Sequence, residues 1–235
     1  MITLHHKSES RGGADYGWLN TKHNFSFSGY YDPQRNNFGS LRVLNDDMVE
    51  PGYGFGTHGH ENMEIISIPL KGELAHKDST GRSEIIRTGE VQIMSAGTGI
   101  RHSEFNPSQD EKVNFLQIWI LPKELNIQPR YEQKQFSADS KKNRFVTVVS
   151  PTDKNSVWIN QDAYLSLGEF DKNTIAEYKV QKETNGIFLF IIKGSFEYEG
   201  TLVSERDSIG IESVSDIELK FKDKTELLVI EVPLK

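Results

Sequence analysis

The sequence predicts an all-β fold made of two antiparallel β-barrels. Short segments rich in Val, Ile, Phe and Tyr recur along the chain, and turn residues separate them. No amphipathic stretch is longer than about ten residues, so helix is expected to be a minor component. A regular succession of short strands and turns is typical of β-sandwiches and barrels. The length of 235 residues suits two domains of roughly 100 to 150 residues each.

Eight segments are expected to form the principal strands. In chain order they are MEIISIPLKG (63–72), EVQIMSAG (90–97), NFLQIWILP (114–122), RFVTVVSP (144–151), GIFLFIIKG (186–194), SFEYEG (195–200), DSIGIES (207–213) and ELLVIEVP (226–233). Their β-branched and aromatic side chains pack well on a pleated surface. Each segment ends at Gly, Pro or Ser, which favour turns.

A weak internal repeat indicates two copies of one barrel. In the first half, EIISIPLKG is followed by the turn DSTG and then GEVQIMSAG; in the second, IFLFIIKG is followed by SFEYEG and then RDSIGIES. Each copy reads as strand, glycine turn, strand, acidic turn residue (Glu90 or Asp207), strand. The polar, proline-marked stretch after Leu121 separates the copies. We therefore expect a first domain at residues 1–122 and a second at residues 123–235.

Composition excludes several classes of function. The chain has no cysteine, so disulfides, thiolate ligands and a cysteine nucleophile are absent. The net charge is −7, and the longest basic cluster is Lys141, Lys142 and Arg144, which argues against direct binding to nucleic acid and leaves a protein partner open. The first twenty residues lack the apolar run of a signal peptide, and no apolar run could span a membrane. We expect a cytoplasmic protein that does not bind membranes.

Two histidines one residue apart in FGTHGHENMEI are the main sign of chemistry. Side chains alternate across a strand, so His58 and His60 face together, and Glu64 faces with them if the strand continues unbroken. His102 and Glu104, in GIRHSEFN, repeat the spacing. Two adjacent strands with two inward ligands each would close a site of three nitrogens and one carboxylate around a divalent metal. All seven histidines lie at or before position 102, so a histidine-ligated metal belongs to the first half.

Several segments resemble the pirin family of the cupin superfamily. They are RGGADYGWL, HNFSFSGYYDP, FGSLRVLNDDMVEPGYGFGTHGHENMEI, DSTG and GEVQIMSAGTGIRHSEFNPS, and they look closest to the bacterial pirin-like proteins described as quercetin 2,3-dioxygenases. The resemblance implies a bicupin with one metal in the first barrel and none in the second. It implies a metal-dependent dioxygenase that cleaves the central ring of flavonols such as quercetin with O2 and releases CO. Other pirins are co-regulators that bind a transcription factor and use iron as a redox switch, which is the alternative function.

By the same resemblance, the metal ligands are His58, His60, His102 and Glu104. The general cupin pattern instead uses the glutamate that follows the histidine pair, here Glu64, and strand parity does not choose between the two carboxylates. Both are therefore candidate catalytic residues. Glu104 is expected to be a ligand and the base that takes the flavonol hydroxyl proton; Glu64 is expected to orient a histidine or, failing Glu104, to be the base. The donor set suits Fe(II), Ni, Co, Mn, Cu or Zn, and the resemblance favours Fe(II).

Other residues near these motifs are expected to be structural or to line a pocket. His23 is expected to be a buried, hydrogen-bonded structural histidine, and Phe27 is expected to belong to the core. Phe55, Met94 and Trp119 neighbour the motifs and are the candidates for pocket lining.

Overall fold

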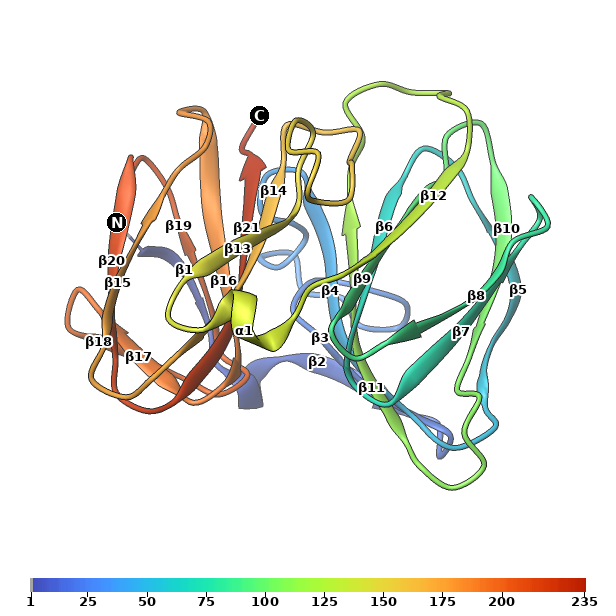
Figure 1. Ribbon diagram of the computed structural model, residues 1–235, viewed down its shortest axis with the longest axis horizontal. Helices are drawn as coiled ribbons and strands as arrows, with labels where there is room; N and C mark the ends of the chain where they lie inside the picture. The colour runs from blue at the N-terminus through green and yellow to red at the C-terminus, as the bar shows by residue number, and fades with distance from the viewer. Residues whose placement is uncertain (1) are drawn as a thin grey trace.

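A computed structural model describes residues 2–235 of the chain. Two halves lie side by side, each built from one large sheet and one four-stranded sheet (Figure 1). Helix is limited to a 3-10 turn at Ser8–Ser10 and to α1 at Ala138–Lys141. The all-β prediction is confirmed, but the sheets are open rather than closed into barrels.

The strands are short and follow one another along the chain. They are β1 (Ile2–His6), β2 (Gly12–Asp15), β3 (Leu19–His23), β4 (Leu41–Val49), β5 (Gly54–His60), β6 (Glu64–Lys71), β7 (Glu73–Asp78), β8 (Ser83–Arg87), β9 (Glu90–Ser95), β10 (Ile100–Phe105), β11 (Val113–Ile120), β12 (Arg130–Gln135), β13 (Phe145–Val149), β14 (Tyr164–Phe170), β15 (Ile175–Lys179), β16 (Asn185–Lys193), β17 (Ser195–Tyr198), β18 (Thr201–Ser204), β19 (Ser208–Ile211), β20 (Asp216–Phe221) and β21 (Thr225–Pro233).

The two halves have matching strand orders. The large sheets run β12-β9-β6-β11-β4-β3-β2 and β1-β19-β16-β21-β14-β13, and the smaller sheets run β5-β10-β7-β8 and β15-β20-β17-β18. Strands β6 and β9, which carry the first copy of the sequence repeat, pair in the same way as β16 and β19, which carry the second. The internal repeat is therefore a structural one.

The halves exchange one strand each. Strand β1 pairs with β19 in the large sheet of the second half, and β12 pairs with β9 in the large sheet of the first half. Directly after β1 in the chain, Lys7 Nζ and Ser8 N donate to the buried carboxylate of Asp207 at 2.9 and 2.8 Å. Segments 1–122 and 123–235 thus each complete the sheet of the other.

The main core lies between the two large sheets. Alternate residues of β11, including Leu116 and Ile118, join a buried cluster with Phe188 and Ile230 of the second half. The intervening residues of β11, such as Gln117, lie on the opposite face, inside the first half. Both faces of this strand are covered, which explains its nearly continuous apolar sequence.

The interior of the second half is filled by apolar side chains. Phe170 and Phe221 stack with their ring centroids 4.2 Å apart, and Tyr178, Ile217 and Leu219 of β15 and β20 are buried in the same cluster. These two strands correspond to β5 and β10 of the first half. Their inner face contributes packing and carries no metal-binding side chain.

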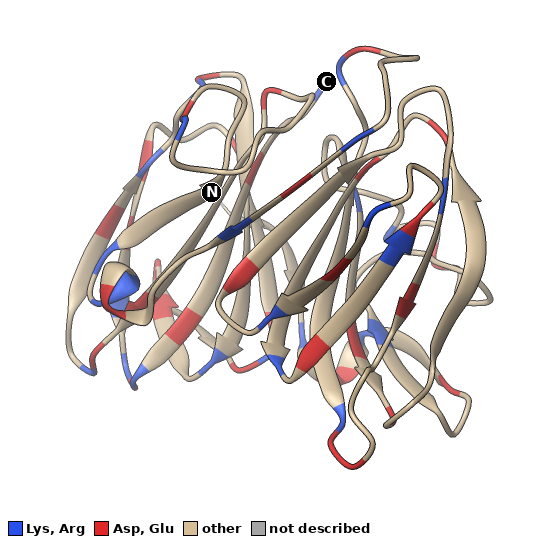
Figure 2. Cartoon of the chain, turned by 45° about the vertical axis from the view of Figure 1, so that its right-hand side comes forward, with Lys and Arg blue, Asp and Glu red and all other residues tan. Residues whose placement is uncertain are grey.

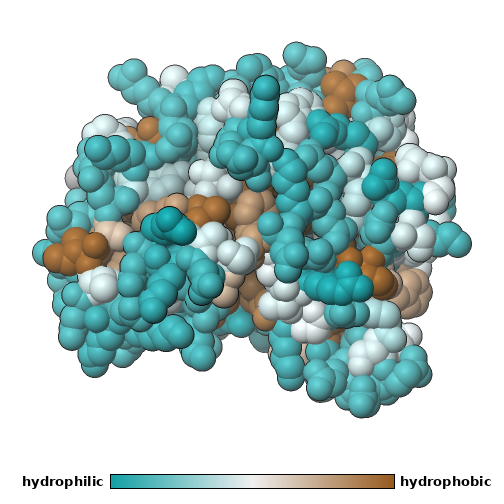
Figure 3. All heavy atoms as spheres, viewed as in Figure 1, coloured by the Kyte–Doolittle hydropathy of each residue, from teal (hydrophilic) through white to brown (hydrophobic). Residues whose placement is uncertain are grey.

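Charged residues are distributed along the chain. Lys and Arg are interspersed with Asp and Glu on strands and loops (Figure 2). The face shown in Figure 3 is mostly hydrophilic, and its hydrophobic residues form small separate groups. Among residues 2–235, no helix has the length and apolar character needed to cross a membrane.

Candidate metal centre

Strands β5 and β10 bring three histidines to one point. His58 lies directly opposite His102 in this antiparallel pair, and His60 lies on the same face as His58, two residues further along β5. One ring nitrogen from each histidine lies within 4.8 Å of those of the other two. The rings of His58 and His102 have their centroids 4.4 Å apart. The structure therefore brings together the three histidines that the sequence predicts as ligands.

A β-bulge in β5 orients His58. The register shifts between His102, which pairs with His58, and Glu104, which pairs with Phe55, so two residues of β5 lie opposite one of β10. The carbonyl of Gly56, in the bulge, accepts a hydrogen bond from His58 Nδ1 at 2.8 Å. This contact assigns the proton to Nδ1 and leaves Nε2 as the nitrogen available to a metal.

The protonation state of the cluster suits a metal site. Burial lowers the pKa of His60 to about 4, helped by the neighbouring His58, and burial together with His58 and His60 lowers the pKa of His102 to about 2. Both rings are therefore neutral near pH 7, as metal ligands must be. Neither buried nitrogen of His102 has a hydrogen-bond partner within residues 2–235. The three imidazoles are thus a fit for one divalent metal ion.

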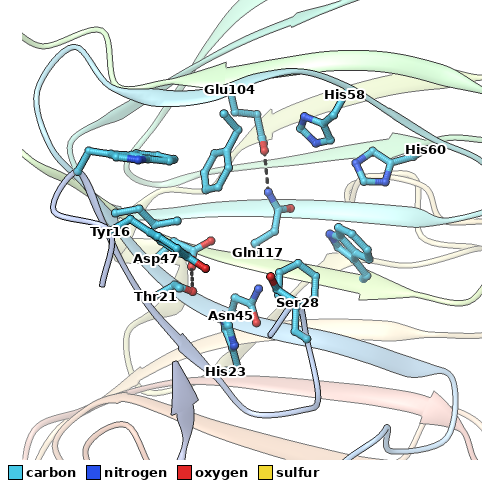
Figure 4. Close-up of a pocket in the computed structure, with 15 residues that line it drawn as sticks. Tyr16, Thr21, His23, Ser28, Asn45, Asp47, His58, His60, Glu104 and Gln117 are labelled. Atoms are coloured by element: carbon cyan, nitrogen blue, oxygen red, sulfur yellow. Dashed lines mark hydrogen bonds between the residues drawn. The ribbon is translucent and has the colours of Figure 1, made fainter. Parts of the chain in front are cut away.

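Glu104 lies beside this cluster. It follows His102 by two residues on β10, so both side chains face the same side, and only 2% of its surface is exposed. Its Oε2 accepts a hydrogen bond from Gln117 Nε2 at 2.9 Å (Figure 4), and its Oε1 accepts one from Ser67 Oγ at 3.1 Å. Burial raises the pKa of Glu104, and these two hydrogen bonds act in the opposite direction. Its carboxylate oxygens lie outside the compact group of three histidine nitrogens.

Glu64 is placed elsewhere. Strand β5 ends at His60, and a turn with Asn62 at a φ of 47° leads into β6, which belongs to the other sheet. Because the strand does not continue, the alternation of side chains does not place Glu64 on the same face as His58 and His60. Its Oε2 accepts hydrogen bonds from Ser95 Oγ at 2.7 Å and from the backbone N of Asn160 at 3.2 Å. Within residues 2–235, no histidine donates a hydrogen bond to this carboxylate.

A cavity of about 390 Å³ extends from His58, His60 and Glu104 into the first half. Phe55 and Trp119 line it, as predicted. Met94 was predicted to line it too; it lies on the same face of the sheet as Gln92, but it packs in a buried cluster with Ile65 and is not among the lining residues. Phe27 was expected in the core and instead lines the cavity. The other side chains of the wall are Tyr16, Trp18, Leu19, Thr21, His23, Ser28, Asn45, Asp47 and Gln117.

A continuous row of polar side chains crosses the large sheet of the first half. In register, the row is His23 (β3), Asn45 (β4), Gln117 (β11), Ser67 (β6) and Gln92 (β9). A row on the matching strands of the second half is Ser166 (β14), Val229 (β21), Leu189 (β16) and Ile209 (β19). The polar row borders a cavity, whereas the largely apolar row belongs to a packed core.

Most residues of this row were not predicted from the sequence to be part of a site. Its signal was a single polar residue within an apolar strand, as with Gln117 in NFLQIWIL and Ser67 in EIISIPL. Such a residue must find a polar partner inside the fold, because burying it alone is unfavourable. His23 was identified, but with a different environment: it is buried as expected, yet neither ring nitrogen has a hydrogen-bond partner among the described residues.

Comparisons with known proteins agree with the fold. The sequence matches the Pirin family over residues 5–120 and the family described as the quercetinase C-terminal cupin domain over residues 147–232. It is 41% identical to the quercetin 2,3-dioxygenase of Escherichia coli strain K12, over 99% of both chains. It is 37% identical to the pirin-like protein of Caulobacter vibrioides, over 94% of this chain and 95% of that protein. Its structure is similar to the crystal structure of the bacterial pirin YhhW from E. coli in complex with nickel(II), with a TM-score of 0.93 and 39% identity over 99% of both chains.

Proposed function

This chain belongs to the pirin family of cupin proteins, and from that premise we propose that it is a metal-dependent dioxygenase that opens the central ring of flavonols with O2 and releases CO. The observation that carries the proposal is the position of the three-histidine cluster at one end of an aromatic-lined cavity. A relative with 41% identity is named quercetin 2,3-dioxygenase. The cavity volume lies in the range typical of small-molecule sites.

We propose His58, His60, His102 and Glu104 as the ligands of one divalent metal ion, with Fe(II) as the native metal. The converging imidazoles support the histidine ligands, and the nickel(II) complex of a related bacterial pirin supports a divalent ion. When bound, the metal supplies a Lewis-acidic centre, which is redox-active in the case of Fe(II). The hydrogen bonds from Ser67 and Gln117 hold the Glu104 carboxylate in a defined orientation.

Glu104 is the proposed base for the flavonol 3-hydroxyl. A buried carboxylate with a raised pKa is a better proton acceptor than a solvated one, because its proton affinity is closer to that of the group it deprotonates. Glu64 does not line the cavity, and its hydrogen bonds to Ser95 and Asn160 connect the two halves. We keep Glu64 as the secondary candidate, to be used only if Glu104 is excluded.

The aromatic wall orients the substrate and excludes water. Phe55 and Trp119 flank the end of the cavity that holds the histidines, and the Trp119 ring lies 4.9 Å from that of His60. Flat aromatic side chains favour a flat aromatic ligand, which agrees with a flavonol. This apolar-lined cavity favours the enzyme over the alternative of an iron-binding, redox-sensing co-regulator.

The decisive experiment measures oxygen uptake by protein stripped of metal and reconstituted separately with Fe(II), Mn(II), Co(II), Ni(II), Cu(II) or Zn(II). Quercetin is added, and the loss of its visible absorption is followed in parallel. We expect coupled loss of oxygen and flavonol with at least one metal, and neither in His102→Ala. A protein that binds metal but consumes no oxygen with any of them would refute flavonol oxygenation. Comparison of proteins captured by the Fe(II) and Fe(III) forms would then test the co-regulator alternative.

A further inference from the structure

We propose that the end of the cavity opposite the histidines is a second binding subsite, which hydrogen-bonds the neutral hydroxyl groups on the part of the substrate remote from the metal. Thr21, His23, Asn45 and Asp47 form it. Figure 4 shows these residues on the side of the cavity opposite His58 and Glu104. The inference rests on the proposed function and narrows its substrates to flat aromatic molecules with several hydroxyl groups.

Two unpartnered polar side chains carry the inference. Asn45 is 3% exposed, and within residues 2–235 its Oδ1 has no hydrogen-bond partner. His23, directly opposite Asn45 on the neighbouring strand, is also 3% exposed, and both of its nitrogens lack a partner in the same part of the chain. Buried polar groups without partners are rare in native proteins because they are unfavourable. Since both side chains line the cavity, a molecule in the cavity is the natural partner.

The chemistry of this end selects neutral hydroxyl groups. Burial, helped by the nearby Arg11 and Lys22, lowers the pKa of His23 to about 4, so the ring is neutral and offers one donor and one acceptor. The amide of Asn45 also offers both. Thr21 Oγ1 donates to Asp47 Oδ1. The carboxyl group of Asp47 can accept a further hydrogen bond from a ligand. A hydroxyl group both donates and accepts, so it satisfies all three kinds of partner.

The position of the subsite sets the length of the ligand. Asn45 lies one strand from Gln117, which hydrogen-bonds Glu104, and His23 lies two strands away. With neighbouring strands about 5 Å apart, the hydroxyl-binding groups lie roughly 5 to 10 Å across the sheet from Gln117. A molecule that reaches both ends must carry hydroxyls on a ring separate from the group held at the histidines. One small ring cannot occupy both.

The test measures binding without turnover. Protein loaded with Zn(II) is titrated under nitrogen with quercetin and with 3-hydroxyflavone, which lacks the remote hydroxyls, and quenching of tryptophan fluorescence gives each Kd. Trp18 and Trp119 lie in the cavity wall and report on occupancy. The variants are Asn45→Leu and, independently, His23→Phe. Each replaces the polar side chain by an apolar one of similar shape. Gln92→Leu is the matched control, because Gln92 belongs to the same polar row but does not line the cavity.

We expect the wild type and Gln92→Leu to bind quercetin about tenfold or more tightly than 3-hydroxyflavone. In Asn45→Leu and His23→Phe, this ratio should fall toward one while the Kd for 3-hydroxyflavone stays the same. An unchanged ratio in both variants, with normal flavonol turnover, would overturn the subsite and leave the proposed function standing. A ratio that collapses in the variants, in protein that oxidises no flavonol with any metal, would support the subsite and refute the proposed function. Absence of binding to the wild type would refute both.

Discussion

Replacing Gln117 by Leu tests how the protein holds the carboxylate of Glu104. The change keeps the size of the side chain and removes the donor that contacts Glu104 Oε2 at 2.9 Å. A hydrogen bond to a charged group contributes about 1.5 to 3 kcal/mol, which corresponds to a pKa change of about 1 to 2 units. The bond favours the ionised form, so its loss raises the pKa of Glu104 further above the usual value. A misplaced and more basic ligand should also weaken metal binding by about 10- to 100-fold.

The assay is competition between the protein and a chelator for Zn(II), at pH values from about 5 to about 8. Metal binding requires an ionised carboxylate, so the loss of affinity on the acid side should begin about 1 to 2 pH units higher in Gln117→Leu than in the wild type. Gln92→Leu is the control: it makes the same replacement in the same buried row, but neither polar atom of the Gln92 side chain has a hydrogen-bond partner within residues 2–235. The control should bind metal like the wild type.

Two outcomes would refute this reasoning. If Gln117→Leu and Gln92→Leu both keep the wild-type affinity and pH dependence, Glu104 is not a ligand whose ionisation limits metal binding. If both lose affinity equally, the effect comes from the general polarity of the row and not from the hydrogen bond to Glu104.

Three further predictions address the base, the polar end of the cavity and the core. Glu104→Gln should lower flavonol turnover by at least about 100-fold, measured per bound metal; full turnover with metal retained would remove the base assignment. Burial raises the pKa of Asp47 from 3.8 to about 7, so the folded state holds this proton more tightly than the unfolded state. The stability from this group is present below about pH 4 and is lost, by roughly 4 kcal/mol at most, as the pH rises through about 7. Urea unfolding of Asp47→Asn should therefore be less pH-dependent than that of the wild type, and equal pH dependence would contradict this assignment. Phe190→Ala, in the core shared by the large sheets, should cost about 3 to 5 kcal/mol in urea unfolding, whereas Tyr31→Ala, at a side chain with 74% exposure, should stay within about 0.5 kcal/mol of the wild type.

Much of the fold could be predicted from local sequence. Strands such as GIFLFIIKG and NFLQIWILP are recognisable because β-branched and aromatic residues between turn residues leave little alternative to a buried strand. The internal repeat was visible because matching strands β6 and β16 face similar environments on the side toward the shared core. The exchange of β1 and β12 was not predictable. Strand β1 pairs with residues some 200 positions away and β12 with residues 35 to 45 positions away, and such pairing leaves no local pattern.

The sequence by itself was enough to predict the histidine cluster of the first half. The spacing of His58 and His60, repeated by His102 and Glu104, requires only the two-residue periodicity of a strand. The confinement of histidine to positions up to 102 assigned the site to that half. These features depend on neighbours in the chain, so they can be inferred without knowing the fold.

Only the tertiary structure shows which carboxylate lies beside the histidines and which residues lie across the cavity from them. The turn after His60 moves Glu64 into the other sheet, where it bonds Ser95 and Asn160, whereas Glu104 remains on the strand of His102. The polar row and the unpartnered Asn45 arise from five strands drawn from distant parts of the chain. The physical reason is that burial and hydrogen-bond partnership are properties of the assembled sheet, and a lone polar residue in an apolar strand acquires its role only from the strands placed beside it.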